Sequence, residues 1–195
     1  MRSVNPGTLN VITGPMFSGK SEELVKRLRR FDLGKLQIKV FNHAIDIRYQ
    51  KGKIVSHNKD SWKAIPINKP IEILKKIKKN TRIVVVDEVQ FFDNQIIEVI
   101  NELVRKGITV FAAGLDTDYR GEPFAATASL LALADGEVVK LRSVCTVCKK
   151  WNATRTQRLR ADGTPAAYNE PLIKVGAKDF YEARCTKHHI VPMKK

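Results

Sequence analysis

The sequence predicts an α/β fold in which helices cover a mainly parallel β-sheet. Two observations lead to this prediction. Apolar runs typical of buried strands alternate with helix-compatible segments between residues 9 and 141. In addition, the first strand leads through a glycine-rich loop straight into a helix. In sheets of this kind ligands bind at the carboxyl ends of the strands, so we expect the functional site there.

The chain begins with the clearest part of this pattern. Leu9–Ile12 is an apolar strand that runs into the glycine-rich loop, and Ser21–Phe31 is the helix that leaves it. Gln37–Phe41 is expected to form a second strand. Residues 43–63 lack clear periodicity, and we therefore expect a long loop or a weak hairpin there.

The central region continues the alternation. Pro70–Lys79 is expected to be a helix, because Ile71, Leu74 and Ile77 recur on one side of it. Arg82–Val86 is a run of branched apolar residues, which is typical of a strand buried on both faces. Both elements therefore support a sheet with helices on its faces.

Two further helix and strand pairs follow. Gln95–Lys106 has apolar residues at helical spacing and ends before Gly107. Ile108–Ala113 is another buried strand, Phe124–Ala134 an apolar helix, and Glu137–Leu141 a last strand. Beyond residue 145 the pattern changes to short segments with turn residues, which indicates a small appended unit.

The glycine-rich loop fits the phosphate-binding pattern G-x-x-x-x-G-K-[ST]. Its residues are Gly14, Pro15, Met16, Phe17, Ser18, Gly19, Lys20 and Ser21. The glycines let successive backbone N–H groups face an anion, and the helix adds its positive end. Lys20 is placed to reach the β- and γ-phosphates, and Ser21 to ligate Mg²⁺. The alternative is a chance match, against which the flanking strand and helix argue.

A second candidate element follows the strand at residues 82–86. Asp87 ends this strand, as in the Walker B arrangement, and is expected to hold Mg²⁺. Glu88 comes next and is a candidate general base. Its proton donor is either a water, as in an ATPase, or a substrate hydroxyl, as in a kinase. The alternative is that the two carboxylates form a strand-end turn or cap the next helix.

The third candidate element consists of two closely spaced pairs of potential metal ligands. Cys145 and Cys148 are separated by two residues, as are Cys185 and His188. Three thiolates and an imidazole suit a tetrahedral Zn²⁺ site, which with four protein ligands is structural. His189 competes with His188, but only His188 keeps the spacing. The alternative is three free or buried cysteines near an incidental histidine pair.

Composition limits the remaining possibilities. No apolar run is long enough to span a membrane, and the amino terminus shows no secretory signal. Three cysteines argue against a disulfide framework and for a reducing compartment. The formal charge is +15, and residues 141–195 carry 12 Lys and Arg against 4 Asp and Glu. Aromatic residues do not alternate with the lysines, so we interpret most of this charge as a solvated surface.

Together these motifs resemble the type II thymidine kinase family over nearly the whole chain. The resemblance rests on the phosphate loop, Asp87–Phe92, Gly114–Phe124 and the late zinc cluster, which occur in the family's order. It implies transfer of the ATP γ-phosphoryl group to the 5′-hydroxyl of deoxythymidine, giving dTMP in pyrimidine salvage. It also implies a RecA-like P-loop domain at residues 1–143 and a zinc-containing lasso domain at residues 144–195.

The resemblance also implies roles for individual residues. Glu88 matches the family's general base, and Gln90 lies in the segment lining the nucleotide site. Asp46 and Arg48 match a D-x-R-Y element, from which Arg48 would approach the transferring phosphoryl group. Thr156 matches a position that touches the 5-methyl group of thymine. The other positions expected around the nucleoside are Met16, Phe91, Leu115, Tyr119, Phe124, Leu172, Ile173, Lys174, Val175, Gly176 and Tyr181.

The family further implies a cytoplasmic homotetramer and feedback inhibition by dTTP. From composition and charge we expect no binding of nucleic acid or membranes. Two other hypotheses remain open at this stage. The basic carboxyl-terminal segment, zinc pairs and phosphate loop also suit a nucleic-acid-binding ATPase. A third hypothesis is an adaptor with an inactive phosphate loop, against which the intact Lys20, Ser21 and Asp87 argue.

Overall fold

The computed structural model describes residues 6–45, 53–55, 61–172 and 181–193. Its centre is a six-stranded sheet in which every neighbouring pair is parallel. From edge to edge the strands are β5 (Ile65–Ile67), β2 (Ile38–His43), β6 (Ile83–Asp87), β7 (Thr109–Gly114), β1 (Leu9–Thr13) and β8 (Val138–Lys140). The predicted parallel α/β sheet is therefore confirmed.

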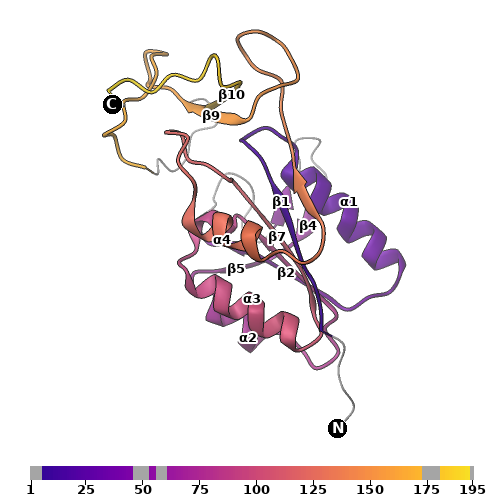
Figure 1. Cartoon of the computed structure of the whole chain (residues 1–195). Coiled ribbons are helices and arrows are strands. Elements are labelled where there is room, and N and C mark those ends of the chain that lie inside the picture. The colour runs from indigo at the N-terminus through magenta and orange to yellow at the C-terminus, as the bar shows by residue number, and fades with distance from the viewer. Residues whose placement is uncertain (1–5, 46–52, 56–60, 173–180, 194–195) are drawn as a thin grey trace.

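Helices cover both faces of this sheet (Figure 1). One face packs against α1 (Lys20–Leu33) and the antiparallel hairpin of β3 (Lys53–Val55) and β4 (Ser61–Lys63). The opposite face packs against α2, α3 and α4. These helices span Ile71–Lys76, Gln95–Arg105 and Ala125–Leu133. The branched residues of the central strands are buried on both sides, which explains their continuous apolar sequence.

The structure differs from the sequence prediction at the edge of the sheet. Residues 43–63 were expected to be a loop or weak hairpin, and their described part does contain the short β3–β4 hairpin. The edge strand β5 was not predicted, because Pro66 lies in its middle. Proline is tolerated on an edge strand, where its missing N–H group breaks no ladder. The helix α2 is also shorter than predicted, since Ile77 already has an extended backbone.

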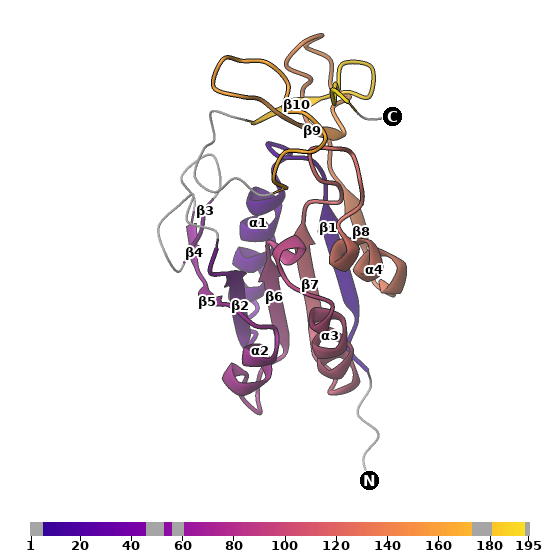
Figure 2. The same ribbon diagram turned by 90° about the vertical axis from the view of Figure 1, so that its left-hand side faces the viewer.

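A small second sheet lies beyond the carboxyl ends of the six strands. It consists of β9 (Arg155–Arg158) and β10 (Tyr181–Arg184), which pair antiparallel. Figures 1 and 2 both show this pair directly above the loop that follows β1. We call the described residues from 144 onward the carboxyl-terminal lobe. Among the described residues, no helix is long and apolar enough to cross a bilayer.

Candidate active site

The loop between β1 and α1 has the backbone that its glycines make possible. Gly14 and Gly19 have φ angles of 147° and 86°, which residues with side chains rarely adopt. A Cβ atom on Gly14 would lie 2.6 Å from the Leu141 carbonyl oxygen and 2.8 Å from Ser18 Oγ. The loop therefore needs glycine here for space as well as for conformation. Helix α1 begins directly afterwards, at Lys20.

Side chains of the loop are arranged for anion binding. Lys20 Nζ donates hydrogen bonds to the carbonyl oxygens of Gly14 (3.2 Å) and Pro15 (2.8 Å), so its ammonium group lies over the loop. Ser18 Oγ is buried and has no hydrogen-bond partner among the described residues. Ser21 is half-buried in the first turn of α1. A buried hydroxyl without a partner fits a loop whose remaining partner is a bound phosphate.

The two carboxylates after β6 are both buried. Asp87 and Glu88 have exposed fractions of only 5% and 7%. Asp87 Oδ1 accepts a hydrogen bond from the Glu88 backbone N–H group at 2.9 Å. Glu88 has a left-handed backbone, with φ of 56° and ψ of 41°. Strain of this kind costs about 1–3 kcal/mol and concentrates at functional sites.

Gln90 connects Glu88 to the end of β7. Its Nε2 group donates a hydrogen bond to Glu88 Oε2, and its Oε1 atom accepts one from the Leu115 N–H group at 3.0 Å. Gln90 itself is buried, and so is its hydrogen bond to Glu88. The Glu88 carboxylate is thereby fixed in position and next in sequence to the metal-binding candidate Asp87.

Gly114 begins one of the segments that carry the family resemblance, but a role for it in the site was not predicted. A Cβ atom there would lie 2.5 Å from Gln90 Oε1 and 2.8 Å from Val89 Cγ2.

We predict that Gly114→Ala displaces Gln90 and lowers turnover by about tenfold to a hundredfold, because small misplacements of catalytic groups are costly. Steady-state kinetics tests this. Gly34→Ala, at an ordinary negative φ, is the matched control and should leave turnover unchanged.

The predicted nucleoside-contacting residues fall into separate groups. Met16 and Thr156 are in contact, because the Met16 N–H group donates to Thr156 Oγ1 at 3.0 Å. Leu115 is joined to Gln90 as described, and the ring of Phe91 lies 5.9 Å from that of His43, between centroids. The Phe124 N–H group donates to the carbonyl oxygen of Asp116 at 3.0 Å, which closes the turn before α4.

The other predicted positions lie in or near the carboxyl-terminal lobe. Tyr119 is buried, and its hydroxyl group lies within hydrogen-bond distance of the carbonyl oxygens of Ala167 and Glu170. Arg158 stacks on its ring, 4.3 Å from the centroid. Tyr119 thus anchors the lobe in this structure. Tyr181 is half-buried on β10, and Leu172 is exposed. Predictions for Asp46, Arg48, Ile173, Lys174, Val175 and Gly176 lie outside the described residues.

The structure brings the four predicted metal ligands together. The ligand atoms of Cys145, Cys148, Cys185 and His188 all lie within 4.8 Å of one another. The Nδ1 atom of His188 is 3.2 Å from Cys185 Sγ and 3.6 Å from Cys145 Sγ. Tetrahedral zinc bonds of about 2.0–2.3 Å separate ligand atoms by roughly 3.3–3.8 Å. The cluster therefore fits a four-coordinate zinc ion.

Neighbouring groups support this assignment. Burial opposes ionisation of Cys145, but hydrogen bonds from the Cys148, Cys185 and Val147 backbone, with His188, lower its pKa to about 5. A thiolate is the form that binds metal. The competing His189 is engaged elsewhere, because its Nε2 atom lies 2.8 Å from the Tyr119 carbonyl oxygen.

Removal of metal from this cluster should loosen the carboxyl-terminal lobe before the six-stranded sheet. The lobe contains few buried apolar residues, whereas the sheet has two large apolar clusters. Hydrogen exchange with and without a zinc chelator measures this. We expect faster exchange in β9 and β10 and unchanged exchange in β6 and β7. Native mass spectrometry showing a fully active, zinc-free protein would contradict the assignment.

Glu170 makes part of the lobe sensitive to acid. Its carboxylate accepts a hydrogen bond from the Ala167 N–H group, which outweighs burial and, with Arg158 and Arg160, lowers its pKa from 4.5 to about 2. A carboxyl group with a lowered pKa stabilises the fold above its unfolded pKa and loses that contribution as pH falls. We expect the stability difference between wild type and Glu170→Gln to shrink from pH 4.5 to about 2. Urea titrations at several pH values, which measure the free energy of unfolding, provide the test.

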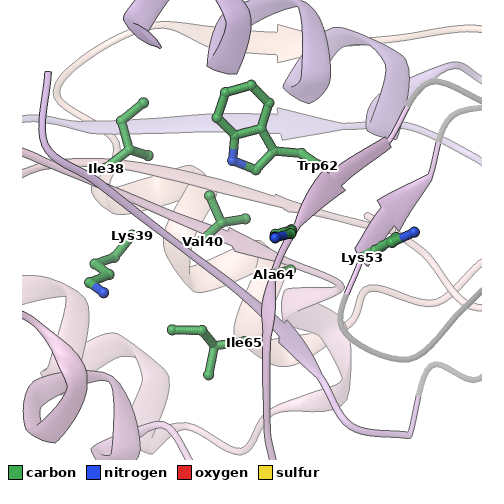
Figure 3. Close-up of a pocket in the computed structure, with 8 residues that line it drawn as sticks. Ile38, Lys39, Val40, Lys53, Trp62, Ala64 and Ile65 are labelled. Carbon is green, nitrogen blue, oxygen red and sulfur yellow. The ribbon is translucent and has the colours of Figure 1, made fainter. Parts of the chain in front are cut away.

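A cavity of about 480 Å³ lies near the β5 edge of the sheet, away from β1. Figure 3 shows it between Trp62 of β4, Ile38 and Val40 of β2, and Ile65 of β5. It arises because β5 pairs only with Phe41–His43, the second half of β2. The strands β6 and β7 separate it from β1. This cavity is therefore not part of the phosphate-loop site.

The strand order and the loop geometry define the class of protein. The phosphate loop follows β1, and the two carboxylates lie at the end of β6. The strand β7 lies between β1 and β6, and all three are parallel, so both groups lie at the carboxyl ends of the strands. Such an arrangement is that of a P-loop nucleotide-binding protein. Comparison with known families is more specific, since the thymidine kinase family model matches residues 7–189. The chain belongs to the thymidine kinase family.

Among solved structures, the chain is similar to the crystal structure of Pif1 helicase from Candida albicans. The two share 18% sequence identity, with a TM-score of 0.42. The match covers 70% of this chain and 36% of the helicase chain.

Proposed function

We propose that this protein is an ATP- and Mg²⁺-dependent kinase that phosphorylates the 5′-hydroxyl group of deoxythymidine. Membership of the thymidine kinase family supports this class of reaction. The observation that carries the assignment to this site is the buried Glu88 carboxylate, held by Gln90 next to Asp87. A carboxylate fixed in this way suits a general base for a positioned hydroxyl group.

The phosphate loop would bind ATP. The backbone of residues 14–21 and the Ser18 hydroxyl would face its phosphates, and Lys20 would exchange its carbonyl partners for phosphate oxygens. Ser21 and Asp87 would hold Mg²⁺, which when bound neutralises charge on the phosphates. Asp46 and Arg48 are proposed to assist at the phosphoryl group, by resemblance to the family.

Glu88 would act on the nucleoside. It accepts the proton of the 5′-hydroxyl group while the 5′-oxygen forms a bond to the γ-phosphorus. The bond between that phosphorus and the β–γ bridging oxygen breaks, and ADP leaves. Gln90 holds the Glu88 carboxylate in place during this step.

The nucleoside would bind between the phosphate loop, the segment after β7 and the carboxyl-terminal lobe. The hydrogen bonds from Met16 to Thr156 and from Leu115 to Gln90 support a nucleoside position in this region. Residues 172–176 would read the base through backbone hydrogen bonds, by resemblance to the family. A site of that kind rejects purines strongly, whereas a missing methyl group is worth only about 1–3 kcal/mol. Deoxyuridine should therefore be a poorer but measurable substrate.

A structural zinc ion is proposed from the cluster of Cys145, Cys148, Cys185 and His188 together with the family. Other features are proposed by resemblance to the family. These are a boundary between residues 143 and 144, a homotetramer, inhibition by dTTP and a cytoplasmic location. We also propose that the substrates do not include nucleic acid.

The test is incubation with ATP labelled at the γ-phosphate and a panel of deoxynucleosides. We expect labelled dTMP from deoxythymidine, less product from deoxyuridine and none from purine deoxynucleosides. Product from every nucleoside alike, or from none, would contradict the proposal.

A further inference from the structure

We propose that the carboxyl-terminal lobe, with Ser143 immediately before it, holds the phosphate loop in its binding conformation. In this clasp Thr156 and Ser143 contact the loop residues Met16 and Phe17. The inference rests on the proposed function insofar as the loop binds ATP. It assigns to the lobe a role in binding ATP as well as the nucleoside.

The first contact is between Thr156 and the loop backbone. Thr156 lies on β9 with an exposed fraction of 2%, and its Oγ1 atom accepts a buried hydrogen bond from the Met16 N–H group at 3.0 Å. By resemblance to the family, Thr156 was expected to touch the 5-methyl group of thymine. The structure shows that its hydroxyl group is bonded to the phosphate loop.

The second contact is at Phe17, whose backbone is strained. Its φ angle of 63° is unfavourable for a bulky side chain and persists only where the surroundings enforce it. The Phe17 carbonyl oxygen accepts a hydrogen bond from Ser143 Oγ at 3.0 Å. Its ring packs against the small cluster of Cys145, Ala153, Ala183 and Cys185. Both contacts come from the end of the chain that carries the metal-ligand cluster.

The clasp and the metal-ligand cluster form one contiguous unit. Ser143 lies two residues before Cys145, and Thr156 pairs with Ala183, two residues before Cys185. The Thr146 N–H group also donates to the Ala183 carbonyl oxygen at 3.0 Å. Zinc that orders the lobe therefore also orders the loop. By thermodynamic linkage, a nucleotide bound to the loop must strengthen zinc binding by the same factor by which zinc strengthens nucleotide binding.

Two substitutions at Thr156 separate the clasp from the contact with thymine. Thr156→Val keeps a methyl group and removes the hydroxyl group, whereas Thr156→Ser does the reverse. Calorimetry with Mg²⁺ and a non-hydrolysable ATP analogue, without nucleoside, measures the loop alone. We expect the analogue to bind Thr156→Val about three- to tenfold more weakly, the usual effect of one lost buried hydrogen bond. Affinity for Thr156→Ser should stay within about twofold of wild type.

Thr164→Val is the matched control. Thr164 is exposed in the same lobe, and its hydroxyl group donates a hydrogen bond to Asp162. Its affinity for the analogue should equal that of wild type. Ser143→Ala provides a second clasp variant should Thr156→Val fold poorly, and melting curves show which variants are folded.

A second measurement tests the linkage to zinc. In the zinc-loaded protein, saturating analogue should slow zinc transfer to a colorimetric chelator severalfold, and Thr156→Val should show a smaller effect. Equal affinity of Thr156→Val and Thr164→Val for the analogue, or zinc release unaffected by the analogue, would overturn the clasp. Wild-type activity on deoxythymidine is measured separately. Its absence would refute the proposed function and leave a positive result on the clasp intact.

Discussion

Replacement of Glu88 by Gln is expected to lower the turnover of deoxythymidine by about two to four orders of magnitude, the usual contribution of a general base. The amide has the same shape as the carboxylate but accepts no proton at neutral pH. Glu88 is buried, and its carboxylate is held by Gln90. ATP binding should be nearly unchanged, because the phosphate loop is a separate segment of the chain.

Steady-state kinetics and calorimetry with ATP together measure both properties. Glu98→Gln, on the exposed side of α3, is the control for loss of one carboxylate and should behave as wild type. Unchanged turnover in Glu88→Gln would remove Glu88 as the base. A parallel loss of ATP affinity would instead assign it to the binding of ATP.

Replacement of Lys20 by Ala is expected to lower turnover by about two to three orders of magnitude, the range for loss of one strong donor to developing charge. The Lys20 ammonium group lies over the loop, on the carbonyl oxygens of Gly14 and Pro15. It is therefore close to where the phosphates would bind. Part of the effect should appear as weaker ATP binding, because the ammonium group also contacts the ground state.

Lys26→Ala is the matched control, since Lys26 lies on the same helix and pairs only loosely with Glu23, at 3.7 Å. Stopped-flow measurement of a single turnover at saturating ATP separates the loss in chemistry from the loss in binding. A rate of phosphoryl transfer in Lys20→Ala equal to that of Lys26→Ala would show that this lysine does not act on the phosphates.

Much of the architecture could be predicted from local sequence. Continuous branched residues such as Val84–Val86 are typical of buried parallel strands, and the glycine-rich loop is identified by spacing alone. The edge of the sheet could not be predicted in the same way. β5 has three residues and a central proline, and its pairing with β2 is a tertiary effect.

The candidate site divides along similar lines. Sequence motifs alone identify Lys20, Asp87 and Glu88 as candidates. The two-residue spacing from Cys185 favours His188 over His189 as the metal ligand, and the geometry of the cluster does the same. The connections between motifs could not be predicted. The hydrogen bond from Met16 to Thr156 spans 140 residues, and that from Leu115 to Gln90 spans 25. No periodicity records contacts over such separations, because they depend on which strand ends the fold brings together.

Tyr119 has a structural role that the family resemblance did not indicate. The family resemblance assigns it to the nucleoside pocket, and the structure surrounds its hydroxyl group with backbone carbonyl oxygens of the lobe. The stacked Arg158, which also pairs with Glu170, adds to this anchorage. In this structure Tyr119 therefore helps to attach the lobe to the segment after β7.

The central claim is that Glu88 serves the hydroxyl group of a small nucleoside and neither water nor a polymer. The most direct measurement is the rate of ADP formation by the purified protein with no acceptor, with deoxythymidine, and with single-stranded DNA or RNA. Our account predicts rapid ADP formation only with deoxythymidine, matched one for one by dTMP. ADP formation at the same rate without deoxythymidine, or stimulated by DNA or RNA and without dTMP, would contradict it.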